Sequence, residues 1–469
     1  MRRIRMQIPA WALCALLAGC AVVGPDYERP KLNLPAQFPI TAAEGSAPLA
    51  ADWWTLYGDA DLNRLVEKAL AANADIAQAV ARVEQAEGVL READGARVPT
   101  VNAGGNAGRS ETAALSPNNQ LGRTIVGNDF KLSLSTSFEI DFWGKLRRAT
   151  EAARAQLLAS NATRDTVRLT VAGAVAQGWF GRRSLDEQIA ATAGTLKSRE
   201  DSARLIGLRL KGGTGSRLDV EQAEIQRADS AVLLRELQRQ RALALSLLGL
   251  LTGDGALDVP AGTLRPGPLP ALPTAGLPSA LLERRPDIRR AEELLVSANA
   301  QIGVAKAAMF PTLTLTGALG NESAALSSLL KGSARFWSLG AGLTMPIFDG
   351  GRNAARTDQA GARQREAVGA YQAAVSTAFK EVADALANLR AARESQADVV
   401  QRADAGERAQ GLAKARFDAG YAGYLELLDA QRTATAARLD VVRNRQAQLN
   451  ASVDLFKALG GGWAGADLK

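Results

Sequence analysis

The chain has 469 residues, a formal net charge of +7, no histidine, and only two cysteines, Cys14 and Cys20. These counts exclude Ser-His-Asp and Cys-His catalysis and zinc sites of Cys and His within the chain. Three positive charges lie in the first five residues and the others alternate with acids, so we expect no nucleic-acid partner. We also expect no enzymatic activity and no metal. Abundant alanine and 5% aromatic residues are typical of long, closely packed helices.

Residues 1–19 have the pattern of an export signal. A basic start precedes an apolar run from Ile8 to Leu17, which is too short to span a membrane. The sequence Leu17-Ala18-Gly19-Cys20 is similar to the bacterial lipoprotein box, in which the cysteine is acylated. The alternative is an incidental cysteine in a plain signal peptide. From the match to this box we predict a covalent lipid on Cys20 and no other cofactor. Because Ala21 and not an aspartate follows the cysteine, we expect the anchor to lie in the outer membrane.

Proline-rich and proline-free stretches alternate after the signal. Residues 20–60 contain several prolines and are predicted to form an extended, lipidated tether. A first helix is expected over 61–97, where apolar residues recur at helical spacing. Residues 145–211 are predicted to form one helix of about 100 Å, and 218–251 a returning helix after the glycines at 212–215. Such lengths are typical of coiled-coil packing.

Alternation of apolar and polar side chains predicts four β-strands. The clearest covers residues 130–143, and similar stretches cover 101–109, 312–320 and 336–345. A tilted strand of roughly ten residues can cross the apolar layer of a bilayer. The half-buried sheet of a soluble protein is the alternative, but four such strands in a helical chain favour a membrane barrel.

An internal repeat relates the two halves of the chain. Asp75 and Pro99 correspond to Asp287 and Pro311 at an offset of 212 residues. Farther on, four residues recur at an offset of 207: Gly144, Thr150, Arg209 and Gly213 match Gly351, Thr357, Arg416 and Gly420. The five-residue difference is expected in a longer loop of the first hairpin, at about 109–129. Each half is therefore predicted as helix, strand, loop, strand, very long helix, turn and helix.

These patterns divide the chain into five parts. They are a signal peptide (1–19), a tether (20–60), a first repeat (61–260) with a hairpin at about 98–143, a proline-rich linker (261–278), and a second repeat (279–469) with a hairpin at about 311–346. Four strands per chain would leave two sheet edges unpaired in lipid, at several kcal/mol for each unsatisfied group. Closure by identical copies is therefore expected, with eight strands in a dimer or twelve in a trimer.

Several short motifs are spread over the chain. They are the lipoprotein box, Val23-Gly24-Pro25-Asp26-Tyr27, Trp53-Trp54, Arg285-Pro286-Asp287-Ile288, Phe310-Pro311, Ile140-Asp141-Phe142-Trp143-Gly144-Lys145, Pro346-Ile347-Phe348-Asp349-Gly350-Gly351, Leu428-Asp429-Ala430-Gln431-Arg432 and Ala458-Leu459-Gly460-Gly461-Gly462-Trp463. Together they resemble the motifs of the TolC-type outer-membrane factors, in particular the lipoprotein subgroup that serves RND efflux pumps. The resemblance covers nearly the whole mature chain.

The resemblance implies a fold, partners and a location. The fold is mainly α with a transmembrane β segment, and three copies form a twelve-stranded β-barrel that continues into a twelve-helix α-barrel. The implied partners are a periplasmic adaptor (membrane fusion) protein, an inner-membrane RND transporter and the lipid of the outer membrane. The implied location is the outer membrane, with the helices extending into the periplasm.

The resemblance also implies a periplasmic gate at the helix turns. Glu426 and Asp429 stand at the positions of the family's acidic pair, and Asp219 follows the equivalent turn of the first half. Residues three apart share a helix face, so threefold symmetry would bring six carboxylates together, and their repulsion would oppose closure. A solvated acidic face on a coiled coil is the alternative. Four residues are expected as partners of these acids in the closed state: Arg416, Arg217, Tyr421 and Arg432.

The function expected from these features is a passive duct that exports toxic small molecules in a tripartite efflux pump. No Gly-x-x-x-x-Gly-Lys motif occurs, so the energy must come from a partner. One alternative shares this architecture but exports polypeptides as the outer-membrane channel of a type I secretion system. A second alternative is a coiled-coil structural lipoprotein without a channel, which the four amphipathic strands disfavour.

Overall fold

The structure is a computed structural model that describes residues 22–32, 50–115, 117, 122–264, 267–271 and 278–461. The predicted signal peptide and Cys20 lie outside these residues. The chain forms two compact units, and each draws on both repeats. The strand unit comprises residues 1–31, 83–160 and 291–371. The helix unit comprises residues 32–82, 161–290 and 372–469.

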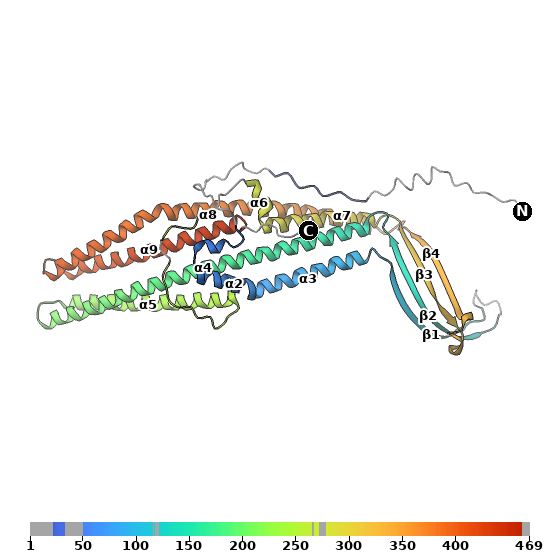
Figure 1. The fold of residues 1–469 in the computed structure, drawn as a ribbon, viewed down its shortest axis with the longest axis horizontal. Helices are drawn as coiled ribbons and strands as arrows, with labels where there is room; N and C mark the ends of the chain where they lie inside the picture. Colours follow the sequence, from blue (N-terminus) through green and yellow to red (C-terminus); the bar gives the residue numbers. More distant parts are fainter. Residues whose placement is uncertain are drawn as a thin grey trace. The chain divides into compact units, whose positions relative to one another are not determined.

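The repeat is reproduced in the bounds of the helices (Figure 1). α3 (Ala74–Gly95) and α7 (Pro286–Ala307) each have 22 residues. α4 (Lys145–Lys211) and α8 (Arg352–Asp418) each have 67 residues, so the predicted single helix over 145–211 is confirmed. The returning helices are α5 (Arg217–Thr252) and α9 (Tyr424–Ala458).

Glycine stands at matched ends of the two long helices. Gly144 and Gly351 precede α4 and α8 with φ angles of 77° and 81°. Gly213 and Gly420 follow the same helices with φ angles of 74° and 78°. Residues with a Cβ rarely adopt this left-handed conformation, so glycine at these positions allows the chain to turn sharply.

The predicted helix over 61–97 is wrong in one respect, because it consists of two helices. α2 (Ala60–Ala72) ends at Asn73, whose backbone is extended, and α3 begins at the next residue. The Asn73 side chain accepts hydrogen bonds from the backbone N–H groups of Asp75 and Ile76 and so caps α3. An asparagine that competes for backbone donors thus interrupts a helix that the apolar spacing alone would continue.

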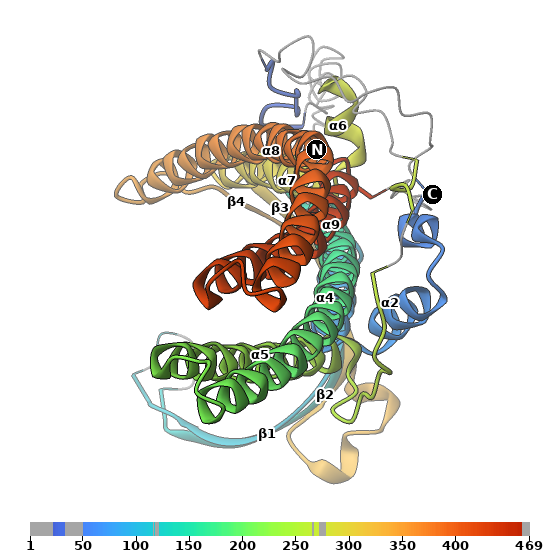
Figure 2. The ribbon, with the colours of Figure 1, turned by 90° about the vertical axis from the view of Figure 1, so that its left-hand side faces the viewer.

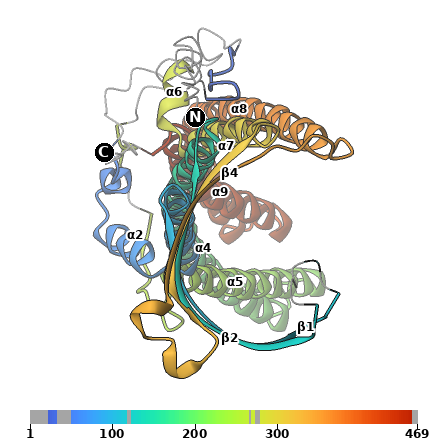
Figure 3. The ribbon, with the colours of Figure 1, turned by 90° about the vertical axis from the view of Figure 1, so that its right-hand side faces the viewer.

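The strand unit contains one antiparallel sheet in the order β1-β2-β3-β4. Its strands are β1 (Thr100–Thr112), β2 (Ile125–Ile140), β3 (Thr312–Ser323) and β4 (Arg335–Thr344). Figure 3 shows them as a curved strip with β1 and β4 at its edges. The short helices η2 (Leu326–Ser328) and η3 (Gly332–Ala334) lie between β3 and β4.

The register of the sheet separates an apolar face from a polar one. Opposite residues share a face, and Leu134, Leu319 and Trp337 are aligned across β2, β3 and β4. Ile140, Leu313 and Leu343 form a second such row. On the opposite face of the sheet, Lys131 is paired with Glu322 across β2 and β3, with 2.9 Å between Nζ and Oε2. The predicted alternation is therefore present in the folded sheet.

Two details of the predicted hairpins are wrong. β2 ends at Ile140, not at Trp143, because the Asp141 carboxylate accepts hydrogen bonds from the N–H groups of Leu146 and Arg147 and caps α4. The extra residues of the first hairpin also lie mainly in a strand and not in the loop. β2 has 16 residues and β4 has 10, whereas the two loops, 113–124 and 324–334, are nearly equal in length.

The helix unit has a core to which four long helices and the short N-terminal elements contribute. Trp53, in η1 (Trp53–Tyr57), is fully buried and stacks on Phe456 of α9 with 5.4 Å between ring centroids. The Tyr57 hydroxyl and the Ser452 hydroxyl share a hydrogen bond of 2.7 Å. Full burial of a side chain as large as Trp53 contributes on the order of 2–3 kcal/mol from apolar area alone.

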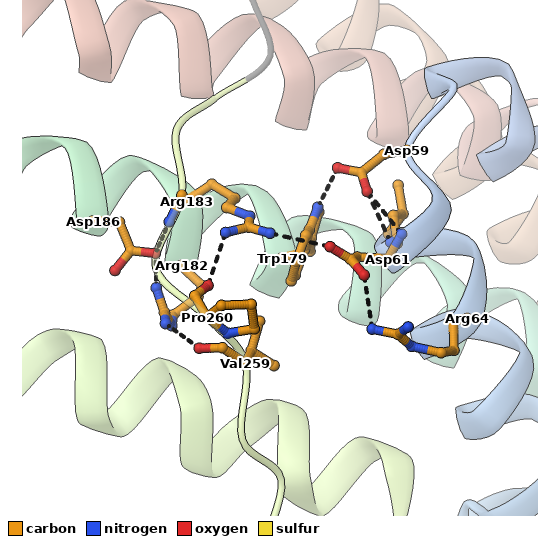
Figure 4. A network of polar contacts seen from close by, with 11 residues as sticks. Asp59, Asp61, Arg64, Trp179, Arg182, Arg183, Asp186, Val259 and Pro260 are labelled. Carbon is orange, nitrogen blue, oxygen red and sulfur yellow. Dashed lines mark hydrogen bonds and ion pairs between the residues drawn. The ribbon is translucent and has the colours of Figure 1, made fainter.

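A polar network surrounds Trp179 of α4 within this core (Figure 4). The Trp179 indole N–H donates to Asp59 at 2.8 Å, and the same carboxylate caps α2 through the N–H groups of Asp61 and Leu62. The Arg183 guanidinium lies over the Trp179 ring at 4.1 Å. The carboxylate thus joins the start of α2 to the middle of α4.

The segment after α5 is held against α4 by two buried arginines. Arg182 donates to the Val259 carbonyl oxygen and Arg183 to the Pro260 carbonyl oxygen, each at 2.9 Å. Arg182 also pairs with Asp186, which in turn accepts from the Arg241 side chain at 2.7 Å.

α6 (Pro278–Arg284) leads from the linker to the second repeat. No helix of the described residues is both long enough and apolar enough to span a membrane.

We predict that Asp59→Ala lowers the free energy of unfolding by about 2 kcal/mol. The substitution removes a helix cap, which typically contributes about 1 kcal/mol, and leaves the buried Trp179 N–H without an acceptor. Urea unfolding of the detergent-solubilised protein, followed by tryptophan fluorescence, measures the change. Asp52→Ala is the matched control because Asp52 precedes η1 without a side-chain cap. Equal destabilisation by the two substitutions would contradict the assigned role of Asp59.

Candidate functional site

The turns between the long helices, at which the sequence predicts a gate, have the same backbone geometry in both repeats. After α4, the Thr214 N–H donates to the Arg209 carbonyl oxygen at 2.9 Å. After α8, the Tyr421 N–H donates to the Arg416 carbonyl oxygen at 2.8 Å. This six-residue bond around a left-handed glycine is the Schellman arrangement that ends helices. Figure 2 shows the helix pairs α4–α5 and α8–α9 from the end at which these turns lie.

One predicted pair of gate residues is in direct contact. The Arg416 Nε atom lies 2.8 Å from Glu426 Oε1, across the turn from α8 to α9. Both side chains are about half exposed, at 57% and 48%. Solvent-exposed ion pairs of this kind contribute at most about 1 kcal/mol and are weakened by salt. The pair can therefore form and break at low energetic cost.

The other predicted gate residues are not paired with each other. Asp429 and Arg432 are exposed on α9, and neither has an ion-pair partner within 4.0 Å among the described residues. Arg217 lies 3.8 Å from Glu221 on its own helix. The Tyr421 side chain is 81% exposed. Asp219 is half-buried near the start of α5. In a single chain, most of these groups are thus available to solvent.

An apolar cluster beside the turns was not predicted from the sequence. It joins Ile206 and Ala223 of the first repeat to residues of the second repeat: Ala413, Phe417, Tyr424, Leu427 and Leu428. The Arg209 guanidinium lies over the Phe417 ring at 4.5 Å. The only signal in the sequence was the set of apolar residues that flank the turn at 420–423. That spacing does not indicate that they meet the other helix pair.

Tyr424 and Arg199 are the buried polar groups beside this cluster. Arg199 Nη1 donates to both the carbonyl and the side-chain oxygen of Gln226 at 2.9 Å. Burial raises the pKa of the Tyr424 phenol, an effect that Arg199 opposes and Asp219 reinforces. The tyrosine therefore stays neutral across the physiological pH range. Glu426 and Asp429, by contrast, are exposed acids at the start of α9.

No group of three or more His, Cys, Asp or Glu side chains within the described residues is arranged to hold a metal ion. Exposed carboxylates and guanidinium groups stand beside a buried apolar cluster at the turn from α8 to α9.

Comparison with known proteins gives consistent matches over both repeats. The sequence model of a family described as Outer membrane efflux protein matches residues 65–254 and 277–461. The outer membrane protein OprJ of Pseudomonas aeruginosa is 37% identical over 473 residues, which cover 98% of this chain and 97% of OprJ. The toluene efflux pump outer membrane protein TtgF of Pseudomonas putida is 36% identical, with 96% of both chains covered.

A solved structure matches the fold over the same extent. The CmeC outer membrane channel of Campylobacter jejuni superposes with a TM-score of 0.89 at 28% identity, and covers 95% of this chain and 96% of CmeC.

We predict that Phe417→Ala loosens the turn between α8 and α9. Loss of a buried phenylalanine costs about 3 kcal/mol, so amides of residues 413–428 should exchange with solvent roughly 100-fold faster. Hydrogen exchange measured by mass spectrometry tests this. Leu412→Ala is the control because Leu412 lies on the same helix and is 68% exposed. Unchanged exchange in the Phe417 variant would mean that the cluster does not hold the turn.

Proposed function

Because the chain belongs to the outer membrane efflux protein family, we propose that three copies build one continuous channel. The protein is the outer-membrane channel component of an efflux system. Four strands from each of three copies would give a twelve-stranded β-barrel in the membrane. The long helices, at 1.5 Å per residue, would continue it as a twelve-helix α-barrel about 100 Å into the periplasm.

The observation that carries the proposal is a sheet that is incomplete in a single chain. Within the described residues, the edge strands β1 and β4 each pair on one side only, with β2 and β3 respectively. On the apolar face, Trp337 and Leu339 are 77% and 80% exposed. Hydrocarbon can cover that face, but it cannot satisfy the unpaired N–H and C=O groups of the edges. Pairing of β4 of one copy with β1 of the next would satisfy both edges and close the wall.

A dimer would satisfy the edges as well as a trimer. Eight strands leave an interior that side chains fill, whereas twelve leave room for a lumen. A passive duct needs the lumen, so the trimer agrees with the efflux function.

The partners and the anchor are also proposed from the family. An inner-membrane RND transporter would supply the energy, and a periplasmic adaptor would join it to the helical end of the duct. Acylation of Cys20 would add a lipid anchor in the outer membrane. The protein itself would be a duct without catalytic activity.

Toxic small molecules are the proposed cargo. The support is the toluene efflux named for the relative TtgF and the lipoprotein box at the N-terminus. A strain that lacks the gene should become hypersensitive to drugs or solvents, and a plasmid copy should restore resistance. Loss of a secreted polypeptide without hypersensitivity would instead support a type I secretion channel. Absence of any conductance in planar bilayers would leave the structural lipoprotein and remove the duct.

We further propose that Glu426 and Asp429 form an acidic ring at the periplasmic end of the duct. Both acids are exposed on α9, three residues apart, and Glu426 is held across the turn by Arg416. Six carboxylates around a threefold axis would repel one another as the ring narrows. Arg416 would reduce that repulsion, and its release would favour opening. Asp219, Arg217, Tyr421 and Arg432 are proposed as further members of this region.

We predict that the double substitution Glu426→Ala and Asp429→Ala changes the resting conductance and reduces the preference for cations. The reason is that six negative charges would be removed from the narrowest part of the lumen. Single-channel currents in asymmetric KCl measure both quantities.

Glu236→Ala removes an exposed acid of α5 away from the turns and should leave both quantities unchanged. Equal currents and equal ion selectivity in the wild-type and double-variant channels would refute the assignment of the ring.

A further inference from the structure

The first described residues, which belong to the motif Val23-Gly24-Pro25-Asp26-Tyr27, have no role in the duct function described above. In the structure they follow a defined path over the strand unit. The Val23 N–H donates to the Trp143 carbonyl oxygen at 3.0 Å. The Asn299 side chain donates to the Pro25 carbonyl oxygen at 2.9 Å. We call residues 22–29 the strap.

Charged side chains hold the strap at two further points. Arg148, of which only 7% of the side chain is exposed, donates to Asp26 at 2.6 Å. Glu292 of α7, of which 12% is exposed, accepts from Arg29 at 2.6 and 2.9 Å and from the Tyr27 hydroxyl at 3.0 Å. Burial and the Glu292 carboxylate raise the pKa of Tyr27, so its hydroxyl remains a donor. These bonds connect the strap to both α4 and α7.

Glycines make room for the strap where it touches other backbone. Gly24 has a φ angle of +108°, and a Cβ added there would lie 2.6 Å from the Cα atom of Gly303. A Cβ on Gly144 would lie 2.6 Å from a methyl carbon of Val22. Close approach of this kind requires glycine, so the surface under the strap is complementary to it in shape. We call this surface the seat; it is formed by Gly144, Arg148, Glu292, Asn299 and Gly303.

The seat is located where strands become helices. Trp143 lies between β2 and α4, and its indole N–H donates to the Pro311 carbonyl oxygen at 2.8 Å. Its ring packs against the Phe310 ring with 4.6 Å between the ring centroids. Pro311 directly precedes β3. The strap therefore binds beside the pairing of β2 with β3, which joins the two hairpins of the chain. Aromatic side chains at strand ends are typical of the membrane interface in β-barrels.

We propose that the strap is an anchor stop, which holds the N-terminal lipid at the strand-to-helix junction and thereby sets the depth of the barrel in the membrane. The inference rests on the lipidation of Cys20 proposed above. Two peptide links separate Cys20 from Val22, so their Cα atoms are at most about 7 Å apart. The partner that this position fits is the acyl layer of the periplasmic leaflet of the outer membrane.

The alternative arrangement, an undocked strap, would allow far more freedom. The first buried residue that fixes the chain after Cys20 would then be Trp53, 33 residues away. A flexible chain of that length has an end-to-end distance of about 30 Å. The lipid would still attach the protein to the membrane, but it would no longer position the junction. Docking thus shortens the distance between Cys20 and the first fixed residue of the fold from about 30 Å to about 7 Å.

Docking of the strap can be measured in the full-length trimer. Glu28→Cys and Arg154→Cys introduce two exposed labelling sites in the strand unit, and acylation leaves Cys20 unreactive. Nitroxide labels on these sites, with labelled chains diluted in unlabelled ones, report one intramolecular distance. We expect a single narrow distance distribution in the parent protein. It should become broad in the variant Glu292→Ala with Asn299→Ala, and remain narrow with Gln301→Ala, an exposed position of α7. A broad distribution in the parent, or no change in the undocking variant, would overturn the proposal.

The depth-setting role needs a second variant, in which the seat is intact. Insertion of Gly-Ser-Gly-Ser between Ala21 and Val22 increases the greatest possible distance between Cys20 and Val22 to about 20 Å. It removes no contact of the strap. We expect an unchanged label distance and at least a twofold loss of trimer in the outer membrane for this variant and for the undocking variant. Normal trimer levels in both variants would overturn the anchor stop.

Lipidation is checked separately by the mass of the N-terminal peptide, with Cys20→Ser as the unlipidated reference. An unmodified Cys20 would overturn the anchor stop and the proposed lipid anchor together, while leaving the duct function untouched. Full acylation with normal trimer levels in both strap variants would overturn the anchor stop alone.

Discussion

The unpaired edges of the four-stranded sheet impose the strongest constraint on this protein. Backbone N–H and C=O groups that face hydrocarbon cannot find water, and each one left unpaired costs several kcal/mol. β1 and β4 are both long, and the apolar face between them is exposed in a single chain. In the proposed assembly other copies satisfy these edges, and the proposed lumen and acidic ring presuppose that closure.

Duplication explains how one chain supplies both hairpins and both long helices. The long helices α4 and α8 have equal lengths, and left-handed glycines stand at their equivalent ends. Differences between the halves are concentrated where they can alter function. β2 is longer than β4, and the turn after α8 carries the Arg416–Glu426 pair, whereas Arg217 after α4 lies near a residue of its own helix. The second repeat thus carries the ion pair on which the proposed gate relies.

The strap adds a relation between the lipid anchor and the fold. Its contacts use residues of the turn between β2 and α4, of α4 and of α7, so the binding site of the strap is complete only when both repeats have folded. A lipid placed by such a seat would orient the hairpins relative to the bilayer, in addition to attaching them. The same contacts explain why glycine stands at positions 24, 144 and 303, since each of these glycines lies at a close approach of two backbones or of a backbone and a side chain.

The sequence by itself determined the periodic features of this protein. Alternation predicted the strands, and proline and glycine positions predicted the ends of the long helices to within a residue or two. The repeat offsets and the family motifs required no coordinates. These features depend on local geometry, which short segments encode directly. The break at Asn73 and the end of β2 at Ile140 were missed because side-chain capping there overrides apolar spacing.

Only the tertiary structure decided which distant residues meet. The contact of Phe417 with Ile206 and Arg209, the carboxylate of Asp59 shared by α2 and Trp179, and the seat of the strap each join segments more than a hundred residues apart. The spacing of apolar residues shows which face of a helix is apolar, but it does not show which other helix packs against that face. Those pairings arise from the packing of complete helices, and they decide which of the predicted gate residues lie together.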